Sequence, residues 1–267
     1  MSLQRAAAIV LRQVYLYRGS PARILPLFGW VAIDIILWGF ITRYLNSVAS
    51  SGFNFVPALL GAVLLWDFFT RVMQGVTTAF FEDVWSRNFL NLFSTPLAIS
   101  EYLAGLVFSS FATSIVGLLV MLVLAIFVFG LNFLSYGALL IPFLLVLFTV
   151  GIALGIAAAS MVLRLGPAAE WLIWPIPAML SPFAGVFYPL STLPRWMQWV
   201  AHLLPPSYVF EGMRGILAGR EMPARDLAAG AVLALFYLAL SSWFFSRTYD
   251  RVVRSGLIAR YSAETVS

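Results

Sequence analysis

The stretch FYPLSTLPRWMQWVAHLLPPSYVFEGMRG, residues 187–215, interrupts a chain that is otherwise almost continuously apolar. Half of the 14 prolines of the chain lie between residues 175 and 206. Because proline has no amide hydrogen and breaks helices from within, we expect a broken helix followed by short helical pieces. Thr192 with Pro194 marks a helix start, and the pair Pro205 and Pro206 marks a stop. They frame a helix of roughly ten residues, which is too short to span a bilayer.

The composition is that of an integral membrane protein. Of the 267 residues, 62% are hydrophobic and 10% are charged, whereas a soluble domain is about half apolar and a quarter charged. The lack of cysteine excludes thiolate metal sites and disulfides. All 16 basic residues are arginines. Without lysine the chain cannot form a standard Walker A site, whose lysine reaches the nucleotide phosphates. If ATP drives this protein, another polypeptide binds it.

Six apolar segments are long enough to cross a bilayer as helices, for which about 20 residues are needed. They cover residues 24–42, 57–81, 102–129, 137–163, 168–188 and 228–246. We therefore expect an all-α integral membrane protein, with residues 1–267 forming a single transmembrane domain. With the N-terminus in the cytoplasm, ten arginines lie inside and five outside, which favours cytoplasmic placement of both termini.

An amphipathic helix is predicted over residues 1–22, ahead of the first span. Arg5 and Arg12 lie on one side of it. The opposite face is apolar and carries Leu3, Ala7, Val10, Val14 and Tyr17. This pattern is typical of a helix that lies on the inner membrane surface. A basic leader without that role is the alternative.

The inner loop FFEDVWSRNFLNLFSTPLAISEY, residues 80–102, contains a candidate docking helix. Asp83 and Arg87 are spaced i,i+4 in the favourable order. An apolar face is expected from Trp85, Phe89, Leu92 and Phe93. A short amphipathic helix between two spans has the shape needed to dock into a groove on a soluble partner. A connector that rests in the lipid headgroups fits the same spacing.

Three ionisable residues fall inside predicted spans: Asp34, Asp67 and Arg71. A lone charge in mid-bilayer costs about 2.5–3.5 kcal/mol, so each should face a partner or water. The i,i+4 spacing lets Asp67 and Arg71 neutralise each other, and Asp34 lies at a similar depth on the neighbouring span. A polar seam within the bundle or at a subunit interface is one interpretation. A substrate or proton pathway is the other.

The short pieces between the last two spans carry interfacial side chains. Trp196 and Trp199 suit the depth at which an indole is half wet, and Glu211 and Arg214 are spaced i,i+3 on a second piece. Irregular backbone at membrane depth is tolerated only where protein or a water-filled cavity surrounds it. We therefore expect residues 189–217 to line or cover a passage. His202, the only histidine, has no catalytic partner motif and is expected to bond to water or backbone.

With these segments in view, the chain resembles the permease subunits of type-2 ABC exporters, which include drug, O-antigen, teichoic-acid and lipo-oligosaccharide export permeases. The resemblance covers nearly the whole length. Its most specific part is SPFAGVFYPLSTLPRWMQWVAHLLPPSYVFEGMRGILAG before the last span, with its GVFYP, LP-x-W and PP-x-x-x-x-E-G-x-R elements. The chain has Pro205 and Pro206 where the family often has Asn-Pro.

The resemblance implies a second copy of the chain and two copies of a separate cytoplasmic ATPase, which binds the ATP and Mg²⁺, so no cofactor is expected on this chain. Residues 82–95 would form the coupling helix that seats in the ATPase, through Glu82, Asp83, Trp85, Arg87 and Phe89. Residues 189–217 would form a re-entrant extracellular gate that includes Tyr188, Pro189, Pro194, Trp196, Trp199, His202, Glu211 and Arg214. The expected location is the bacterial inner membrane, in contact with lipid and without nucleic acid.

The expected function is export of a lipid-linked glycan, a lipid or a hydrophobic small molecule by alternating access. A self-contained carrier or channel driven by an ion gradient is the main alternative. Such folds often have broken helices in both halves, whereas here the break is confined to the region after the fifth predicted span. A membrane-embedded enzyme would need a polar cluster beyond His202.

Overall fold

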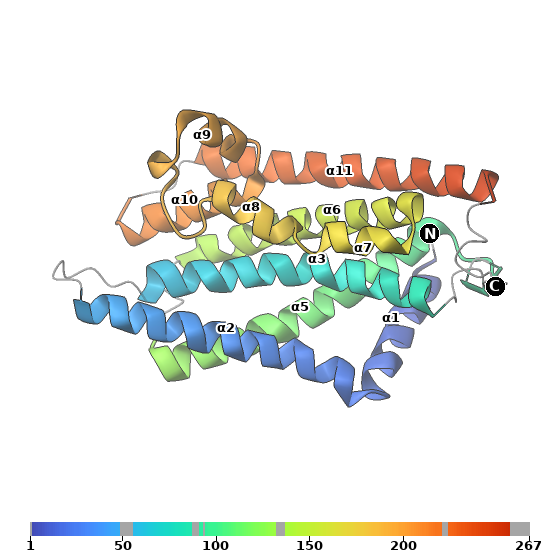
Figure 1. The fold of residues 1–267 in the computed structure, drawn as a ribbon, viewed down its shortest axis with the longest axis horizontal. Helices are drawn as coiled ribbons and strands as arrows, with labels where there is room; N and C mark the ends of the chain where they lie inside the picture. Colours follow the sequence, from blue (N-terminus) through green and yellow to red (C-terminus); the bar gives the residue numbers. More distant parts are fainter. Residues whose placement is uncertain are drawn as a thin grey trace.

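The computed structural model of the protein is a bundle of helices that run back and forth between two ends (Figure 1). It describes residues 2–48, 56–86, 91–92, 94–131, 137–220 and 224–256, and within these ranges it contains helices and turns but no strand. Five of the described helices are long and apolar enough to cross a membrane. They are α2 (Pro21–Val48), α3 (Gly61–Trp85, preceded by the π-helical turn Val56–Leu60), α5 (Ile99–Phe129), α6 (Leu140–Leu165) and α11 (Ala224–Arg254). The chain is thus a multi-pass, all-helical membrane protein.

The predicted span 168–188 is not one continuous helix. It consists of the 3₁₀ turn Pro167–Ala169, α7 (Glu170–Ile173) and α8 (Ile176–Ala184). Pro175 lies between α7 and α8 and Pro177 near the start of α8, and neither has an amide hydrogen to continue the helix from the preceding turn. α7 and α8 follow one another along the bundle, from the end where α6 terminates towards the opposite end (Figure 1). Five long helices and this broken segment therefore take the place of the six expected spans.

The two ends of the bundle differ in what they hold (Figure 1). One end, called the α1 end below, contains α1 (Leu3–Arg18), the last turn of α3, the start of α5 and the end of α11. The opposite end, called the α9 end, contains the 3₁₀ turn Leu190–Thr192, α9 (Arg195–His202) and α10 (Pro205–Leu217). These short elements match the predicted pieces between residues 189 and 217. The pair Pro205 and Pro206 begins α10 as well as separating it from α9, as expected of proline in a first helical turn.

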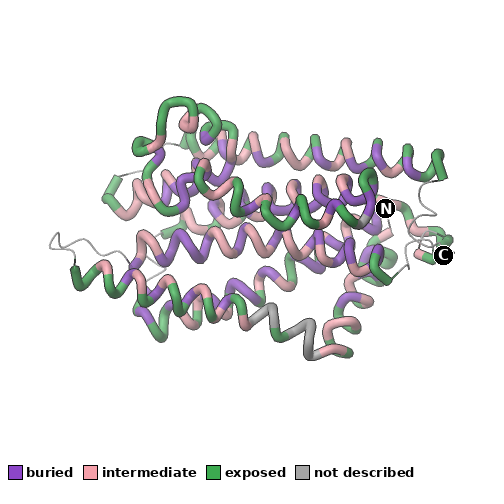
Figure 2. Tube along the Cα trace, viewed as in Figure 1, coloured by how far each residue is buried: buried purple, intermediate pink, exposed green. Residues whose placement is uncertain are grey.

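The core is centred on α3, which packs against both α5 and α6 and is buried along much of its length (Figure 2). Its contact with α6 is close because two glycines of α6 face it. A methyl group added at Gly155 would lie 2.8 Å from the Val76 Cβ, and one at Gly151 would lie 2.9 Å from the Val72 Cβ. Small residues spaced four apart let membrane helices approach until their backbones nearly touch.

α1 is a helix within residues 1–22, where an amphipathic helix is predicted. It packs on α5 through Ala6, Ile9 and Gln13, which are buried. Its exposed side carries Leu3, Leu11 and Val14. An apolar face turned away from the protein is the arrangement that suits a helix lying against lipid. Its position on the inner membrane surface stays a prediction.

Candidate functional site

A cavity of about 520 Å³ lies over one face of α3. Its walls come from α1, α2, α3, α5 and the segment between α7 and α8. The lining residues are Tyr17, Trp30, Asp34, Asp67, Thr70, Arg71, Gln74, Gly75, Thr78, Glu82, Thr113 and Trp174. The cavity exists because α2 packs mainly on α5 and on the turn Val56–Leu60 rather than on α3. We call it the α3 cavity.

The α3 side of this cavity is a polar stripe. Asp67, Arg71, Gln74, Thr78 and Glu82 follow one another at intervals of three or four residues, so they share one face of the helix. The opposite face holds buried apolar residues such as Phe69, Val72 and Phe80. α3 is therefore amphipathic, and its polar face lines the α3 cavity.

The three charged residues predicted inside the spans meet in the α3 cavity. Asp34 comes from α2, and Asp67 and Arg71 come from α3. The guanidinium charge of Arg71 acts on both carboxylates. Gly117 of α5 makes room for Arg71, because a methyl group at Gly117 would lie 2.6 Å from the Arg71 Cδ. Asp34 thus lines the same cavity as the pair on α3.

Among the residues that line the α3 cavity, the Asp67 Oδ2 and the Thr70 hydroxyl are buried polar atoms without a hydrogen-bond partner in the described part of the chain. Buried polar atoms are nearly always satisfied by protein, water or ligand, since leaving one unpaired costs about 1–3 kcal/mol.

At the α1 end, a buried polar network ties three helices together. The Asp83 carboxylate of α3 is fully buried and forms an ion pair with Arg12 of α1. It also accepts a hydrogen bond of 2.7 Å from the Tyr102 hydroxyl of α5. Burial alone lowers the pKa of Arg12, but the hydrogen bond and charge of Asp83 outweigh that effect and raise the pKa above its usual value. Arg12 therefore stays charged.

The sequence spacing suggests Arg87 as a partner of Asp83, whereas in the structure the Asp83 carboxylate is buried and pairs with Arg12. The last turn of α3 faces α1 and α5, so the carboxylate points into the protein and its cation comes from the N-terminal helix. Residues 82–85 belong to α3 itself rather than to a separate short helix. Arg87 and Phe89 lie outside the described residues.

A second ion pair strengthens the attachment of α1. Glu101 of α5 accepts hydrogen bonds from the backbone N–H of Ser2 at 2.6 Å and from that of Ala98 at 3.0 Å. The Arg5 guanidinium lies 3.4 Å from the same carboxylate and also donates to the Pro96 carbonyl. Both arginines of α1 that were predicted to face away from its apolar side thus bind the bundle.

The other residues predicted for coupling occupy two different surroundings. Trp85 is 52% exposed and stacks on Phe81, with ring centroids 5.4 Å apart. Glu82 lines the α3 cavity. Among the predicted coupling residues that the structure describes, Trp85 presents a large apolar surface at the α1 end.

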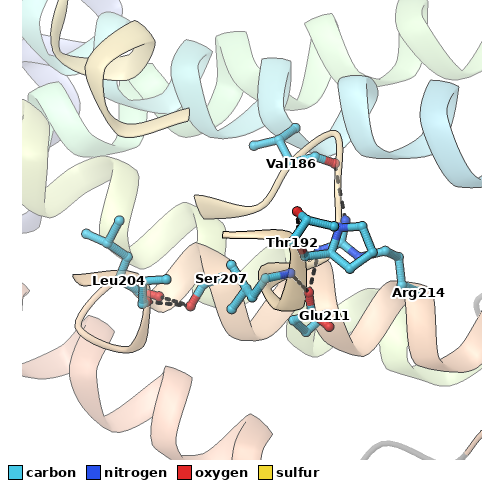
Figure 3. A network of polar contacts seen from close by, with 9 residues as sticks. Val186, Thr192, Leu204, Ser207, Glu211 and Arg214 are labelled. Atoms are coloured by element: carbon cyan, nitrogen blue, oxygen red, sulfur yellow. Dashed lines mark hydrogen bonds and ion pairs between the residues drawn. The ribbon is translucent and has the colours of Figure 1, made fainter. Parts of the chain in front are cut away.

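At the α9 end, Glu211 and Arg214 of α10 hold the turns that follow α8 (Figure 3). The two side chains form an ion pair at 2.9 Å, as their i,i+3 spacing predicts. Glu211 also accepts a hydrogen bond of 2.7 Å from the Leu190 amide, and Arg214 donates to the Val186 carbonyl at 3.4 Å. A charge pair on α10 thereby fixes the backbone of the segment that leads into α9.

The remaining residues predicted for the gate lie in α9 and in the segment that leads into it. Trp196 and Trp199 of α9 are 62% and 76% exposed, so α9 turns its indoles outward. His202 is exposed, and its backbone carbonyl accepts a hydrogen bond of 2.9 Å from the Tyr208 hydroxyl. The Tyr188 hydroxyl donates to the Pro182 carbonyl at 2.8 Å. Pro189 and Pro194 stand directly before the turn Leu190–Thr192 and before α9.

Several site residues escaped the sequence analysis. Thr70, Gln74 and Thr78 could have been found by extending the spacing from Asp67 and Arg71 along α3. Trp30, Trp174 and Thr113 come from other helices, so the period of α3 says nothing about them. The same holds for Arg12 and Tyr102, which meet Asp83 only through the fold.

Comparison with known proteins agrees with this architecture. The family model of the ABC-2 type transporters matches residues 7–218. A search among curated proteins gave no match. The matched segment runs from α1 to the end of α10 and therefore includes the network at Asp83, the α3 cavity and the gate pieces. Because the match covers well over half of the chain, the chain belongs to the ABC-2 type transporter family and is a membrane-embedded transport subunit of that family.

Proposed function

We propose that the chain is the permease subunit of an ATP-driven exporter, in which a separate ATPase supplies the energy and the α3 cavity forms part of the passage. The family membership supports the transport role. The lack of lysine supports placing the nucleotide site on another polypeptide, since a Walker A site requires one. The substrate then moves outward by alternating access.

The observation that carries this proposal is the network of Arg12, Asp83 and Tyr102. It joins α1, α3 and α5 at the end of the bundle where Trp85 is exposed. A force applied at this end would move α1, α3 and α5 together, because moving one helix alone would leave a buried charge unpaired. One face of α3 contacts the core, and the opposite face forms a wall of the α3 cavity.

The topology supports an orientation with the α1 end in the cytoplasm. The arginine bias of the sequence favours cytoplasmic placement of both termini, and α1 lies at the same end of the bundle as the end of α11 (Figure 1). We count α7 and α8 as the fifth of six crossings, since they lead from the α1 end towards the α9 end. The elements at the α9 end then form the extracellular gate of a bacterial inner-membrane protein.

The α3 cavity is open on the side away from the core, and we propose that a second copy of the chain closes it. Two copies would then pair with two ATPase subunits. Charged and polar side chains within a span are costly unless they face protein or water, and a passage between two permease copies provides both. Glu82, Trp85, Arg87 and Phe89 are proposed to contact the ATPase, with Asp83 acting from within the bundle.

The test first asks whether a gene beside that of the chain encodes an ATPase with Walker A and Walker B motifs, and then co-purifies this ATPase with the chain. The tagged wild-type permease should retain this ATPase and support ATP hydrolysis. Trp85→Ala should reduce the retained ATPase at least several-fold without changing the amount of permease in the membrane. Trp243→Ala is the matched control, because Trp243 of α11 is similarly exposed at 57%. Full retention by the Trp85 variant would refute the contact, and solute movement by the isolated chain without any ATPase would refute the proposed function.

A further inference from the structure

We infer that α11 holds one anionic phospholipid, whose phosphate lies on arginines near the end of the helix and whose acyl chain enters an apolar cavity beside it. Such a lipid stays on the outside of the bundle and is distinct from the transported substrate. α11 runs along the edge of the bundle opposite α2 in Figure 1, and among the described residues none lines both this site and the α3 cavity. In the orientation proposed above, on which this last step rests, the lipid belongs to the inner leaflet.

The headgroup end of the site is a hollow of about 410 Å³ at the end of α11. It is lined by Arg247, Asp250, Arg251, Arg254 and Ser255. The three arginines are exposed, and none of them forms an ion pair with another residue that the structure describes. Three guanidinium groups and one carboxylate leave an excess of two positive charges, which suits a phosphate. A zwitterionic headgroup would bring a further cation among the arginines, whereas an anionic headgroup would not.

The arginines continue an exposed stripe of α11 that begins in the apolar part of the helix. Trp243, Arg247, Arg251 and Arg254 follow one another at intervals of three or four residues, so they share one face. Trp243 is 57% exposed, and the guanidinium carbon of Arg247 lies 5.6 Å from the centre of an indole ring of Trp243. This contact holds the charge at the depth of an interfacial indole, where lipid phosphates lie.

The apolar end of the site is a cavity of about 490 Å³ between α3, α6, α8, α11 and the start of α10. Trp243 lines it as well, so the cavity and the arginine hollow are linked through one indole. The lining side chains are apolar or aromatic except for two hydroxyls that bind backbone carbonyls. Tyr237 donates to Leu203 at 2.8 Å and Ser241 to Leu238 at 3.0 Å. A hydrocarbon chain complements such walls, because a polar group that entered them would lose its partners in water.

The distance along α11 matches the depth of one leaflet. From Arg247 to Tyr237 there are ten residue steps, which is about 15 Å at 1.5 Å per residue. Half of a hydrocarbon core of about 30 Å is the same length. An acyl chain whose headgroup rests on Arg247 therefore reaches the level of Tyr237 in the middle of the membrane.

An acidic surface of the ATPase is the strongest competitor for the arginines, because they lie at the end of the bundle where the ATPase is proposed to dock. A soluble partner would use the arginines alone and leave the adjoining apolar cavity unfilled. The contact between Arg247 and Trp243 also draws one of the charges towards the membrane rather than away from it. A phospholipid uses the hollow, the indole and the cavity together, which favours the lipid.

The test follows lipid binding to the full-length chain in detergent by native mass spectrometry. Dioleoyl phosphatidylglycerol is the anionic probe, dioleoyl phosphatidylcholine is the zwitterionic probe with the same chains, and glycerol 1-phosphate is the free phosphate. We expect one phosphatidylglycerol per chain, bound at least about tenfold more tightly than phosphatidylcholine, because the arginines repel the choline cation. Excess glycerol 1-phosphate should not displace it. Equal affinity for the two lipids, or displacement by glycerol 1-phosphate at a comparable concentration, would overturn the inference.

Charge variants assign the headgroup to the arginine hollow. Arg247→Gln with Arg251→Gln should weaken phosphatidylglycerol binding by about 25-fold, since each basic residue near an anionic surface contributes about a factor of five. The control Arg220→Gln with Arg225→Gln removes the same charge at the α9 end, where both arginines are exposed, and should bind like the wild type. An equal loss in the two double variants would mean that net charge alone attracts the lipid, and it would overturn the assignment.

The acyl chain is tested by its length and by filling the cavity. Dihexanoyl phosphatidylglycerol has the same headgroup with six-carbon chains, and it should bind the wild type at least about tenfold more weakly because fewer methylene groups are buried. Ala157→Leu, in the α6 wall of the cavity, should weaken binding of the dioleoyl lipid at least about fivefold and leave the dihexanoyl lipid unaffected. Ala228→Leu, at an exposed position of α11, is the control. Equal binding of the two chain lengths, which needs no variant, would show that no chain enters the cavity and would overturn the inference.

One further measurement separates the lipid site from the ATPase contact. Arg247→Gln with Arg251→Gln should retain as much ATPase as the wild type does. Loss of the ATPase from this variant, with phosphatidylglycerol binding unchanged, would assign the arginines to the partner protein and overturn the inference. Because lipid binding is measured on the chain alone, its absence would end the lipid site and leave the proposed permease role intact.

Discussion

Asp83 and Arg12 lie 71 residues apart in sequence and form an ion pair in which the carboxylate is fully buried. The pair connects the helix that lies outside the bundle to the helix at its centre. Tyr102 supplies a third contact from α5. The attachment of α1 is therefore a specific polar connection in addition to an apolar packing contact.

Replacing Arg12 with alanine should destabilise the protein by about 3–5 kcal/mol, because it leaves the Asp83 charge buried without its cation. The measurement is the unfolding midpoint of the purified chain in detergent, taken with the yield of folded protein. The double variant Arg12→Met with Asp83→Leu should recover most of the loss, since both charges are then gone. Additive losses in the double variant would contradict a direct interaction between the two residues.

Gln13 should be replaceable by an apolar residue with a gain in stability. Its side chain is 2% exposed, and neither amide atom has a hydrogen-bond partner in the described structure. Gln13→Met keeps the length of the side chain and removes the unsatisfied groups, which should stabilise the fold by about 1–3 kcal/mol. The exposed Gln4 on the same helix serves as the control, and Gln4→Met should change the unfolding midpoint little. A loss of stability in Gln13→Met would mean that the amide binds water or a partner.

The contact between Glu211 and the Leu190 amide predicts a local effect at the gate. Glu211→Ala removes the acceptor of this hydrogen bond and the partner of Arg214. Hydrogen exchange of the turn Leu190–Thr192 should become at least about fivefold faster, since a typical hydrogen bond contributes about 1 kcal/mol. Glu170→Ala on α7 should leave that exchange rate unchanged. Equal exchange in the wild type and the Glu211 variant would show that the turn is held by other contacts.

The indoles of α9 are expected to act in transport rather than in assembly. Trp196→Ala combined with Trp199→Ala removes two exposed side chains, so the unfolding midpoint should change by less than about 1 kcal/mol in free energy. The rate of export into vesicles that contain the complex should change markedly, while the ATPase remains bound to the permease. Trp171→Ala, also highly exposed but on α7, is the matched control. A normal export rate in the double variant would remove these residues from the gate.

The close approach of α6 to α3 makes Gly155 intolerant of a side chain. Gly155→Ala places a methyl group 2.8 Å from the Val76 Cβ, and this overpacking should cost about 1–3 kcal/mol. Gly29→Ala on α2 meets nothing within 4 Å and should be neutral or stabilising by up to about 1 kcal/mol. Thermal unfolding of the two variants, side by side, checks the difference. Similar midpoints would show that α3 and α6 separate easily.

Much of the architecture could be predicted because it depends on local signals. Apolar length placed the long helices, the cluster of prolines located α8, α9 and α10, and the i,i+3 spacing paired Glu211 with Arg214. The partner of Asp83 could not be predicted, since periodicity within one helix does not say which other helix faces it. The Asp83 carboxylate is within reach of Arg87 on sequence spacing alone, and only the packing of α1 against α5 brings Arg12 to it.

The position of the break between α7 and α8 was also only partly predictable. The prolines at 175, 177 and 182 predict a break in the helix. Pro182 nevertheless lies inside α8, while Pro175 precedes it. A proline near a helix start is tolerated, and one further along weakens the helix without always ending it. Which of them divides the helix depends on the packing around each.

The polar stripe on α3 has a consequence for how this gene can vary. Each residue added to or removed from a helix rotates everything beyond it by about 100°. A single-codon insertion between Asp67 and Gln74 would rotate Gln74, Thr78 and Glu82 out of the α3 cavity and rotate phenylalanines into it. Point substitutions on this helix can be tolerated one at a time, whereas an insertion or deletion within it cannot. We therefore expect relatives to differ in the residues of this helix but not in its length.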